Sequence, residues 1–190
     1  MTIKAVLRMG AKLLGEVAAP VTEFNSTDLD AIVQDMLDTM QHLDGAGIAA
    51  PQIGVSQRII IFGIDHNPRY PDVEPVPLTV LINPEIEIID DNQNTLWEGC
   101  LSVPGMRGLV ARPNKIKYVG FDPQGTKIER VAEDFHARVV LHESDHLDGI
   151  LYPQRIDDLS QFGFIEELEA AGKLPKKTTE DTDTDAGSES

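Results

Sequence analysis

His142 to His146 reads HESDH, inside a helical pattern that runs from Ala137 to about Leu151. The i, i+4 spacing places both imidazoles on one face of a helix, about one turn apart, where both can bind one divalent ion. Glu143 follows the first histidine, roughly 100° around the helix. There its carboxylate can border the open position of the ion and act as general acid and base without being a ligand. A metal site is therefore the leading interpretation of this helix.

The third ligand must come from elsewhere in the chain. His-Glu-x-x-His alone arises by chance, and its alternative is an exposed, charged helix turn. That alternative is weakened here because Val139, Leu147 and Ile150 continue an apolar stripe on the same face. A catalytic site normally adds a third protein ligand and a water. No histidine follows Gly149, and the later glutamates fall in the predicted last helix or the polar tail. Cys100, the single cysteine, is the leading candidate, and no internal disulfide can form.

Two further segments share a small-residue character. Residues 98–105 read EGCLSVPG, where Gly99 allows close backbone approach and a Pro-Gly pair turns the chain. A thiolate at Cys100 could then face the helix. Residues 45–54 read GAGIAAPQIG, with Gln52 as the single polar amide. Taken alone, this stretch is a packed turn before a strand, and a polar pocket wall is the alternative.

Short elements surround the histidine helix in the sequence. A first helix is predicted after the candidate N-caps Ser26 and Thr27, where apolar residues recur on one face until Gly45. Residues 65–77 carry four prolines and predict a surface loop. A final helix is predicted over 157–170, and strands are predicted at 58–64, 78–82, 85–89, 115–121 and 127–132. The expected fold is α+β, with small antiparallel β-sheets packed around a central His-Glu-x-x-His helix and a C-terminal helix.

Composition limits the class of protein. The 190 residues, 41% of them apolar, suit one domain, predicted at 1–172. Residues 173–190 hold one large apolar residue among lysines, threonines and acids, which predicts a disordered acidic tail. The 32 acidic and 16 basic residues give a formal charge of −16, so neither nucleic acid nor anionic membrane is an expected partner. No apolar run approaches the ~20 residues that span a bilayer, and the first ten residues lack a signal peptide, so a cytoplasmic protein is expected.

Three of these segments together resemble the motifs of the peptide deformylase family, which run Gly-x-Gly-x-Ala-Ala-x-Gln, Glu-Gly-Cys-Leu-Ser and His-Glu-x-x-Asp-His-Leu-x-Gly. The resemblance extends from near residue 7 to about residue 164. It implies that Cys100, His142 and His146 bind the metal and that Glu143 is the acid and base. It also implies that two groups donate hydrogen bonds to the oxyanion, namely the Gln52 side chain and the Leu101 backbone amide.

The resemblance further implies an activity. Members of the family remove the formyl group from N-terminal formylmethionine of nascent polypeptides, and they have mixed α+β folds. They typically use one ferrous ion per chain, although zinc, nickel and cobalt also accept such ligands. Some members reach the ribosome with a basic C-terminal helix. This chain instead ends in FIEELEAAGK and an acidic tail, which does not support ribosome association by that route.

Other candidate residues follow from their proximity to the motifs. Arg112 is expected to pair with Glu98 and hold the ligand loop, and Asp145 to orient an imidazole or a neighbouring arginine. Ordinary surface ion pairs and a solvated helix aspartate are the alternatives. An apolar pocket for the methionine side chain is also required. The residues expected to contact substrate are Ala46, Gly47, Gly99, Arg107 and Val139, with Phe135 as a further pocket candidate. Core packing is the alternative for Phe135 and Val139.

Two other functions remain open from the residues alone. One is a zinc endopeptidase, which predicts a third ligand other than Cys100. The other is a noncatalytic protein in which the same three ligands only stabilise the fold, which predicts a closed, four-coordinate site without an open position.

Overall fold

The computed structural model describes residues 2–64 and 74–175. Its described strands form one antiparallel sheet in the order β1-β2-β3-β4-β5, and β6 pairs with β4. The strands are β1 (Gly47–Ala49), β2 (Ile59–Ile64), β3 (Val76–Cys100), β4 (Val103–Phe121), β5 (Lys127–Glu133) and β6 (Phe162–Phe164). The expected α+β class with antiparallel strands is confirmed, but these strands share one sheet and do not divide into several small ones.

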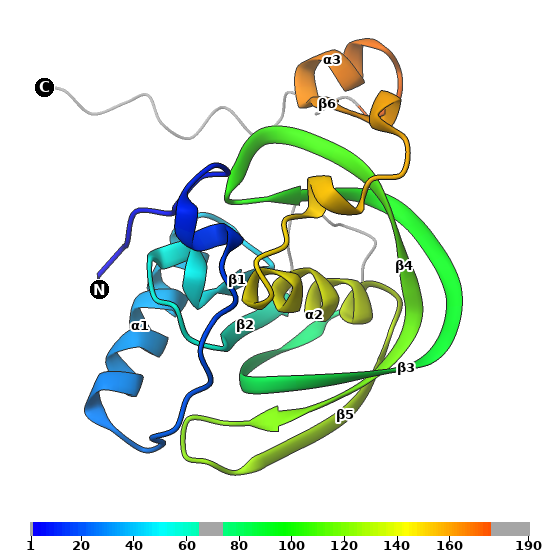
Figure 1. Cartoon of the computed structure of the whole chain (residues 1–190). Helices are drawn as coiled ribbons and strands as arrows, with labels where there is room; N and C mark the ends of the chain where they lie inside the picture. Colours follow the sequence, from blue (N-terminus) through cyan, green and yellow to red (C-terminus); the bar gives the residue numbers. More distant parts are fainter. Residues whose placement is uncertain (1, 65–73, 176–190) are drawn as a thin grey trace, which may run out of the picture.

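The length of the β3–β4 hairpin explains the single sheet. β3 has 25 residues and β4 has 19, so the predicted strands at 78–82 and 85–89 are parts of one strand. Pairing shifts register between Ile82 and Glu85 and again between Asp90 and Gln93, and such irregularities bend a hairpin and increase its twist. The hairpin therefore curves around α2 (Asp134–Leu147), as Figure 1 shows.

Two helices cover opposite faces of the sheet. α1 (Thr27–His42) begins where predicted, and the Ser26 hydroxyl accepts a hydrogen bond from the Leu29 amide at 3.3 Å. Alternate residues of β2 point to the two sides: Ile60 and Phe62 belong to the core beneath α2, and Ile59 and Ile61 to the core beneath α1. The continuous apolar run of β2 is thus buried on both faces.

The C-terminal region differs from the prediction. Only its second half is helical, as α3 (Ile165–Ala170), whereas the preceding residues form a short 3-10 turn and β6. The cause is non-local, because β6 pairs with β4 over Met106–Gly108. The predicted tail also begins with structure, since the amides of Lys173 and Leu174 bond to the Leu168 carbonyl.

Parts of two predictions lie outside the described residues: 65–73 of the predicted loop and 176–190 of the predicted tail. The end of the predicted loop is a correction, because Pro77 lies in β3. Proline is tolerated there, near the first residue of a strand. In the described part of the chain, no helix is both long enough and apolar enough to cross a membrane.

Candidate active site

Three ligand atoms converge where the end of β3 meets α2. The sulfur of Cys100 and one ring nitrogen each of His142 and His146 all lie within 4.8 Å of one another. Cys100 Sγ is 3.2 Å from His146 Nε2. One ion with bonds of about 2.0–2.3 Å can reach all three atoms. A thiolate with two imidazoles suits first-row transition ions such as iron, cobalt, nickel and zinc, so the residues fit the metal expected from the sequence.

Glu98 orients the first histidine. Its Oε2 accepts a hydrogen bond from His142 Nδ1 at 2.9 Å, which leaves Nε2 of that ring for an ion. Burial alone would raise the pKa of the Glu98 carboxyl, but hydrogen bonds from Arg112 and His142 hold this pKa well below its usual range. Glu98 is therefore an ionised, buried carboxylate behind the ligand.

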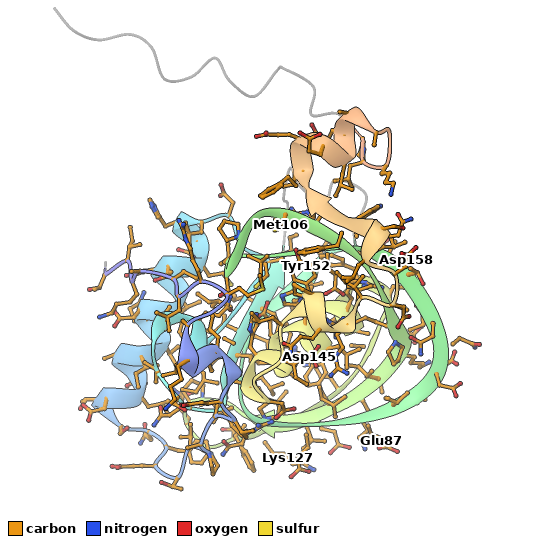
Figure 2. All side chains as sticks on the ribbon, turned by 45° about the horizontal axis from the view of Figure 1, so that its top comes forward. Glu87, Met106, Lys127, Asp145, Tyr152 and Asp158 are labelled. Atoms are coloured by element: carbon orange, nitrogen blue, oxygen red, sulfur yellow. The ribbon has the colours of Figure 1, made fainter. Side chains whose placement is uncertain are left out.

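A chain of ion pairs continues from Glu98; it is buried as far as Asp145 and ends at Arg155, which is exposed. Arg112 binds both Glu98 oxygens, at 2.7 and 2.9 Å, and also donates to Asp145 Oδ2 at 2.8 Å. Arg155 donates to Asp145 Oδ1 at 2.6 Å, and Arg138 donates to Glu98 Oε1 at 2.5 Å. Asp145 thus contacts two arginines and no imidazole among the bonds described. Figure 2 shows Asp145 inside the bend of β3 and β4.

The Glu143 side chain packs against the backbone of Gly47. This side chain is buried, and Oε2 has no hydrogen-bond partner among the described residues. A Cβ atom on Gly47 of β1 would lie only 2.4 Å from Glu143 Oε1, so the carboxylate occupies space that only glycine leaves free. Burial raises the pKa of Glu143 to about 7, close to the value that suits a group exchanging protons near neutral pH.

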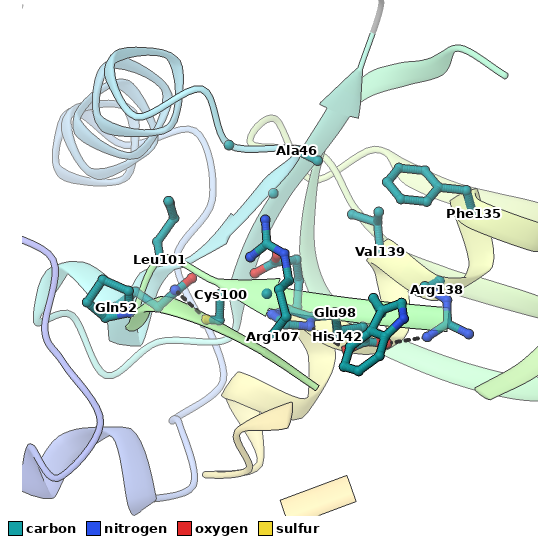
Figure 3. Close-up of a pocket in the computed structure, with 16 residues that line it drawn as sticks. Ala46, Gln52, Glu98, Cys100, Leu101, Arg107, Phe135, Arg138, Val139 and His142 are labelled. Carbon is teal, nitrogen blue, oxygen red and sulfur yellow. Dashed lines mark hydrogen bonds and ion pairs between the residues drawn. The ribbon is translucent and has the colours of Figure 1, made fainter. Parts of the chain in front are cut away.

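Gln52 points its amide nitrogen at the same site. Its Oε1 accepts a hydrogen bond from the Ala49 amide at 2.8 Å, which orients the side chain. Its Nε2 then lies 3.1 Å from Ser102 Oγ. The same nitrogen is 3.5 Å from Cys100 Sγ, a contact drawn in Figure 3. Leu101 belongs to the tight turn between β3 and β4, outside the strands themselves. Gln52 and Leu101 thus reach the same cavity from two separate segments of the chain.

A cavity of about 200 Å³ opens beside these groups. Arg107 is one of the residues that line it (Figure 3), and its guanidinium fills the space in which a Cβ on Gly99 would lie. The cavity wall includes all residues predicted to contact substrate, and also Phe135: Ala46, Gly47, Gly99, Arg107, Phe135 and Val139. Trp97 and Pro104 line it as well and were not predicted.

Three polar residues of the site were not predicted from the sequence: Arg138, Arg155 and Ser102. Arg138 carried a usable signal, because it lies four residues before His142 on the same helix face. An arginine on a buried stripe requires a partner. Arg155 and Ser102 offered no comparable signal, since their partners Asp145 and Gln52 are brought to them only by folding.

Comparison with known proteins gives one consistent result. The sequence profile of polypeptide deformylase matches residues 3–162. Peptide deformylase 1 of Nitrosomonas europaea is 55% identical over 166 residues, which cover 87% of this chain and 94% of that protein. Peptide deformylase 1 of Bordetella pertussis is also 55% identical, with the same 87% and 94% coverage.

Solved structures agree. The Met-ala-ser bound crystal structure of class I type b peptide deformylase from Acinetobacter baumannii is 42% identical, with a TM-score of 0.79, and the match covers 82% of this chain and 99% of that chain. Peptide deformylase from Thermotoga maritima is 35% identical, with a TM-score of 0.73, over 83% of this chain and 100% of that chain. This chain therefore belongs to the polypeptide deformylase family.

Proposed function

We propose that Cys100, His142 and His146 hold one divalent ion and that Glu143 is the acid and base in the reaction of this family. The chain removes the formyl group from N-terminal formylmethionine of newly synthesised polypeptides, which is the known function of peptide deformylases. The observation that supports the residue roles is the convergence of a sulfur and two ring nitrogens beside a cavity whose wall includes Cys100, His142 and the buried Glu143.

Ferrous iron is the proposed ion, because it is the usual metal of the family and because a thiolate with two imidazoles accepts it. A bound divalent ion acidifies water and polarises a carbonyl oxygen. The proposed catalytic unit is residues 1–172, and the proposed location is the cytoplasm, where nascent formylated chains are made.

Each remaining step falls to side chains of the site. Glu143, as a carboxylate, accepts the proton that water loses as its oxygen bonds to the formyl carbon. Gln52 Nε2 and the Leu101 amide donate hydrogen bonds to the carbonyl oxygen as it gains negative charge. When the carbon–nitrogen bond breaks, Glu143 returns the proton to the leaving amine. The products are formate and a peptide with a free N-terminal methionine.

The backbone of the substrate peptide is proposed to pair with one edge of the sheet. β1 is the terminal strand of the described sheet, and it pairs only with β2 among those strands. We propose that the substrate adds along its other edge as an extended chain, with the methionine side chain in the cavity near Ala46, Phe135 and Val139. The Acinetobacter baumannii deformylase bound to Met-ala-ser, a deformylated tripeptide, supports a peptide ligand of this kind.

The alternatives have less support. A closed staple would surround its ion with protein, whereas Cys100 and His142 both line the cavity. An endopeptidase of the His-Glu-x-x-His type would take a third ligand elsewhere, whereas Cys100 Sγ lies 3.2 Å from His146 Nε2.

The test is release of free amine from formyl-Met-Ala-Ser by anaerobically purified, iron-loaded protein. Glu143→Gln should retain the metal and lose about 10²- to 10⁴-fold in kcat, the usual contribution of a general base. Glu87→Gln is the matched control, because Glu87 is exposed on the outer side of β3 (Figure 2). The proposal fails if the wild-type protein releases no amine, or if Glu143→Gln turns over at the wild-type rate.

A further inference from the structure

Arg138 links α2 and β3, the two elements that carry the proposed metal ligands. It lies one turn before His142 on α2 and is 5% exposed. Its guanidinium donates to Glu98 Oε1 at 2.5 Å, to the Val110 carbonyl at 3.1 Å and to the Asn94 carbonyl. We propose that Arg138 is a positioning residue, which fixes Glu98 behind His142 and holds the β3–β4 hairpin against α2. The inference rests on the metal site proposed above.

The first argument is the hydrogen-bond count at Glu98. A carboxylate offers about four lone-pair sites. Oε1 accepts from Arg112 Nε and from Arg138, and Oε2 accepts from Arg112 Nη2 and from His142 Nδ1. Arg138 therefore fills the last site and sets the plane of the carboxylate. Without it, Glu98 can rotate about the Arg112 pair, and the direction of its bond to His142 is no longer fixed.

Buried charge gives the second argument. Arg112 divides its donors between Glu98 and Asp145, which are both buried. Arg138 is the second buried arginine at Glu98, so the buried group holds two cations and two anions. Loss of one member of such a set leaves a buried charge without compensation, which is costly. The effect would fall on the residues directly behind the metal ligands.

The third argument is the geometry of the hairpin. Asn94 belongs to β3 and Val110 to β4, so Arg138 binds carbonyls from both strands where the hairpin bends around α2 (Figure 1). Cys100 ends β3, six residues beyond Asn94. One guanidinium thus connects the helix that bears both histidines to the strand that bears the thiolate. Lysine cannot replace it fully, because a single ammonium cannot span Glu98 and both carbonyls.

The test measures metal affinity separately from turnover. Arg138→Met keeps an unbranched side chain about as long as the stem of arginine up to Nε and removes the donors, and Co²⁺ affinity is measured by competition with a chelating dye. We expect affinity to fall by about 10- to 100-fold, the usual effect of losing a partner behind a ligand, with altered visible absorption of the bound cobalt. For formyl-Met-Ala-Ser on the loaded variant, kcat should fall more than KM rises.

Arg58→Met is the matched control. Arg58 secures the other end of α2, through Asp148 at 2.7 Å and the Leu147 carbonyl at 3.3 Å, so it reports general loosening of the helix. It should leave Co²⁺ affinity within about twofold of wild type. Equal losses in Arg58→Met and Arg138→Met would overturn the proposal, and so would a wild-type affinity in Arg138→Met.

Two more variants keep the test decisive. If Arg138→Met does not fold, Arg138→Lys retains the charge and should bind Co²⁺ more weakly than wild type, and wild-type affinity would contradict the proposal. In a Glu98→Gln background, Arg138→Met should cost much less affinity than in wild type, because both act on the same ligand. Equal costs in the two backgrounds would show that Arg138 does not act through Glu98. These readouts need no amide hydrolysis, so they stand even if formyl-Met-Ala-Ser is not cleaved.

Discussion

Gly47→Ala should disable Glu143, the proposed acid and base, without altering a metal ligand. An added Cβ would lie 2.4 Å from Glu143 Oε1 and 2.8 Å from its Cδ and Cγ, whereas ordinary contact begins at 3.4 Å. The backbone of β1 cannot retreat easily, because Gly47 pairs with Phe62 in β2. The carboxylate must therefore move by about 1 Å, and misplacement on that scale costs about 100-fold in rate. This corresponds to about 2.7 kcal/mol in the barrier.

The assay compares kcat of iron-loaded wild type and Gly47→Ala on formyl-Met-Ala-Ser, with metal content measured on the same samples. Gly15→Ala is the control, since a Cβ there meets nothing within 4 Å. In a Glu143→Ala background the extra methyl should have little further effect, because the group that it displaces is gone. A Gly47→Ala rate within threefold of wild type, at equal metal content, would refute the argument.

Three other outcomes are expected. Gln52→Ala should lower kcat by about 100-fold, as loss of one oxyanion donor does. Ser102→Ala should lower kcat less, because Gln52 keeps its bond to the Ala49 amide. Equal losses of kcat in the two variants would contradict the role of Gln52 as a donor. Removal of the ion by a chelator should lower Tm by about 5–10 °C if the ion had been at 100 times its Kd, and an unchanged Tm would exclude a folded-state metal site. Lys117 and Lys127 hold the pKa of Glu129 at about 2, so its contribution to stability is present above the ordinary value near 4.5 and is lost as pH falls toward 2. The Tm difference between wild type and Glu129→Gln should therefore vanish across that window, and a constant difference down to pH 2 would contradict the ion pairs.

Local patterns predicted the parts of the site that lie within one segment. The i, i+4 histidines locate α2, but the predicted span of Ala137 to about Leu151 is wrong at both ends, because α2 is Asp134–Leu147 and Gly149, with a φ of 72°, leaves Ile150 outside the helix. The glycine-rich setting of Cys100 identified its segment as one that could approach the helix. The continuation of β3 through Asp90–Gln93 was not predictable, because these polar residues are typical of a turn and become a strand only by pairing with β4. β6 was missed for the same reason.

The arginine network could not be predicted, because the residues that it joins are far apart in the sequence. Arg138 bonds to Asn94, 44 positions away, and Arg112 bonds to Asp145, 33 positions away. No short-range pattern encodes which carbonyl or carboxylate will meet a buried guanidinium. The expected pairing of Arg112 with Glu98 was an exception, since the hairpin brings these neighbours together over only 14 positions.

An exposed strand edge is usually a liability, because a neighbouring molecule can pair with it and start aggregation. β1 is the terminal strand of the described sheet, but it offers only three residues, Gly47–Ala49. Ile48 and Ala49 are buried, and the Ala49 amide already donates to Gln52 Oε1, so a misplaced neighbour finds few bonds there. The same brevity bears on the docking mode proposed for the substrate. In that mode, main-chain pairing uses backbone groups that every residue shares. A ladder of three residues aligns the substrate with few bonds, and few bonds must break before the product leaves.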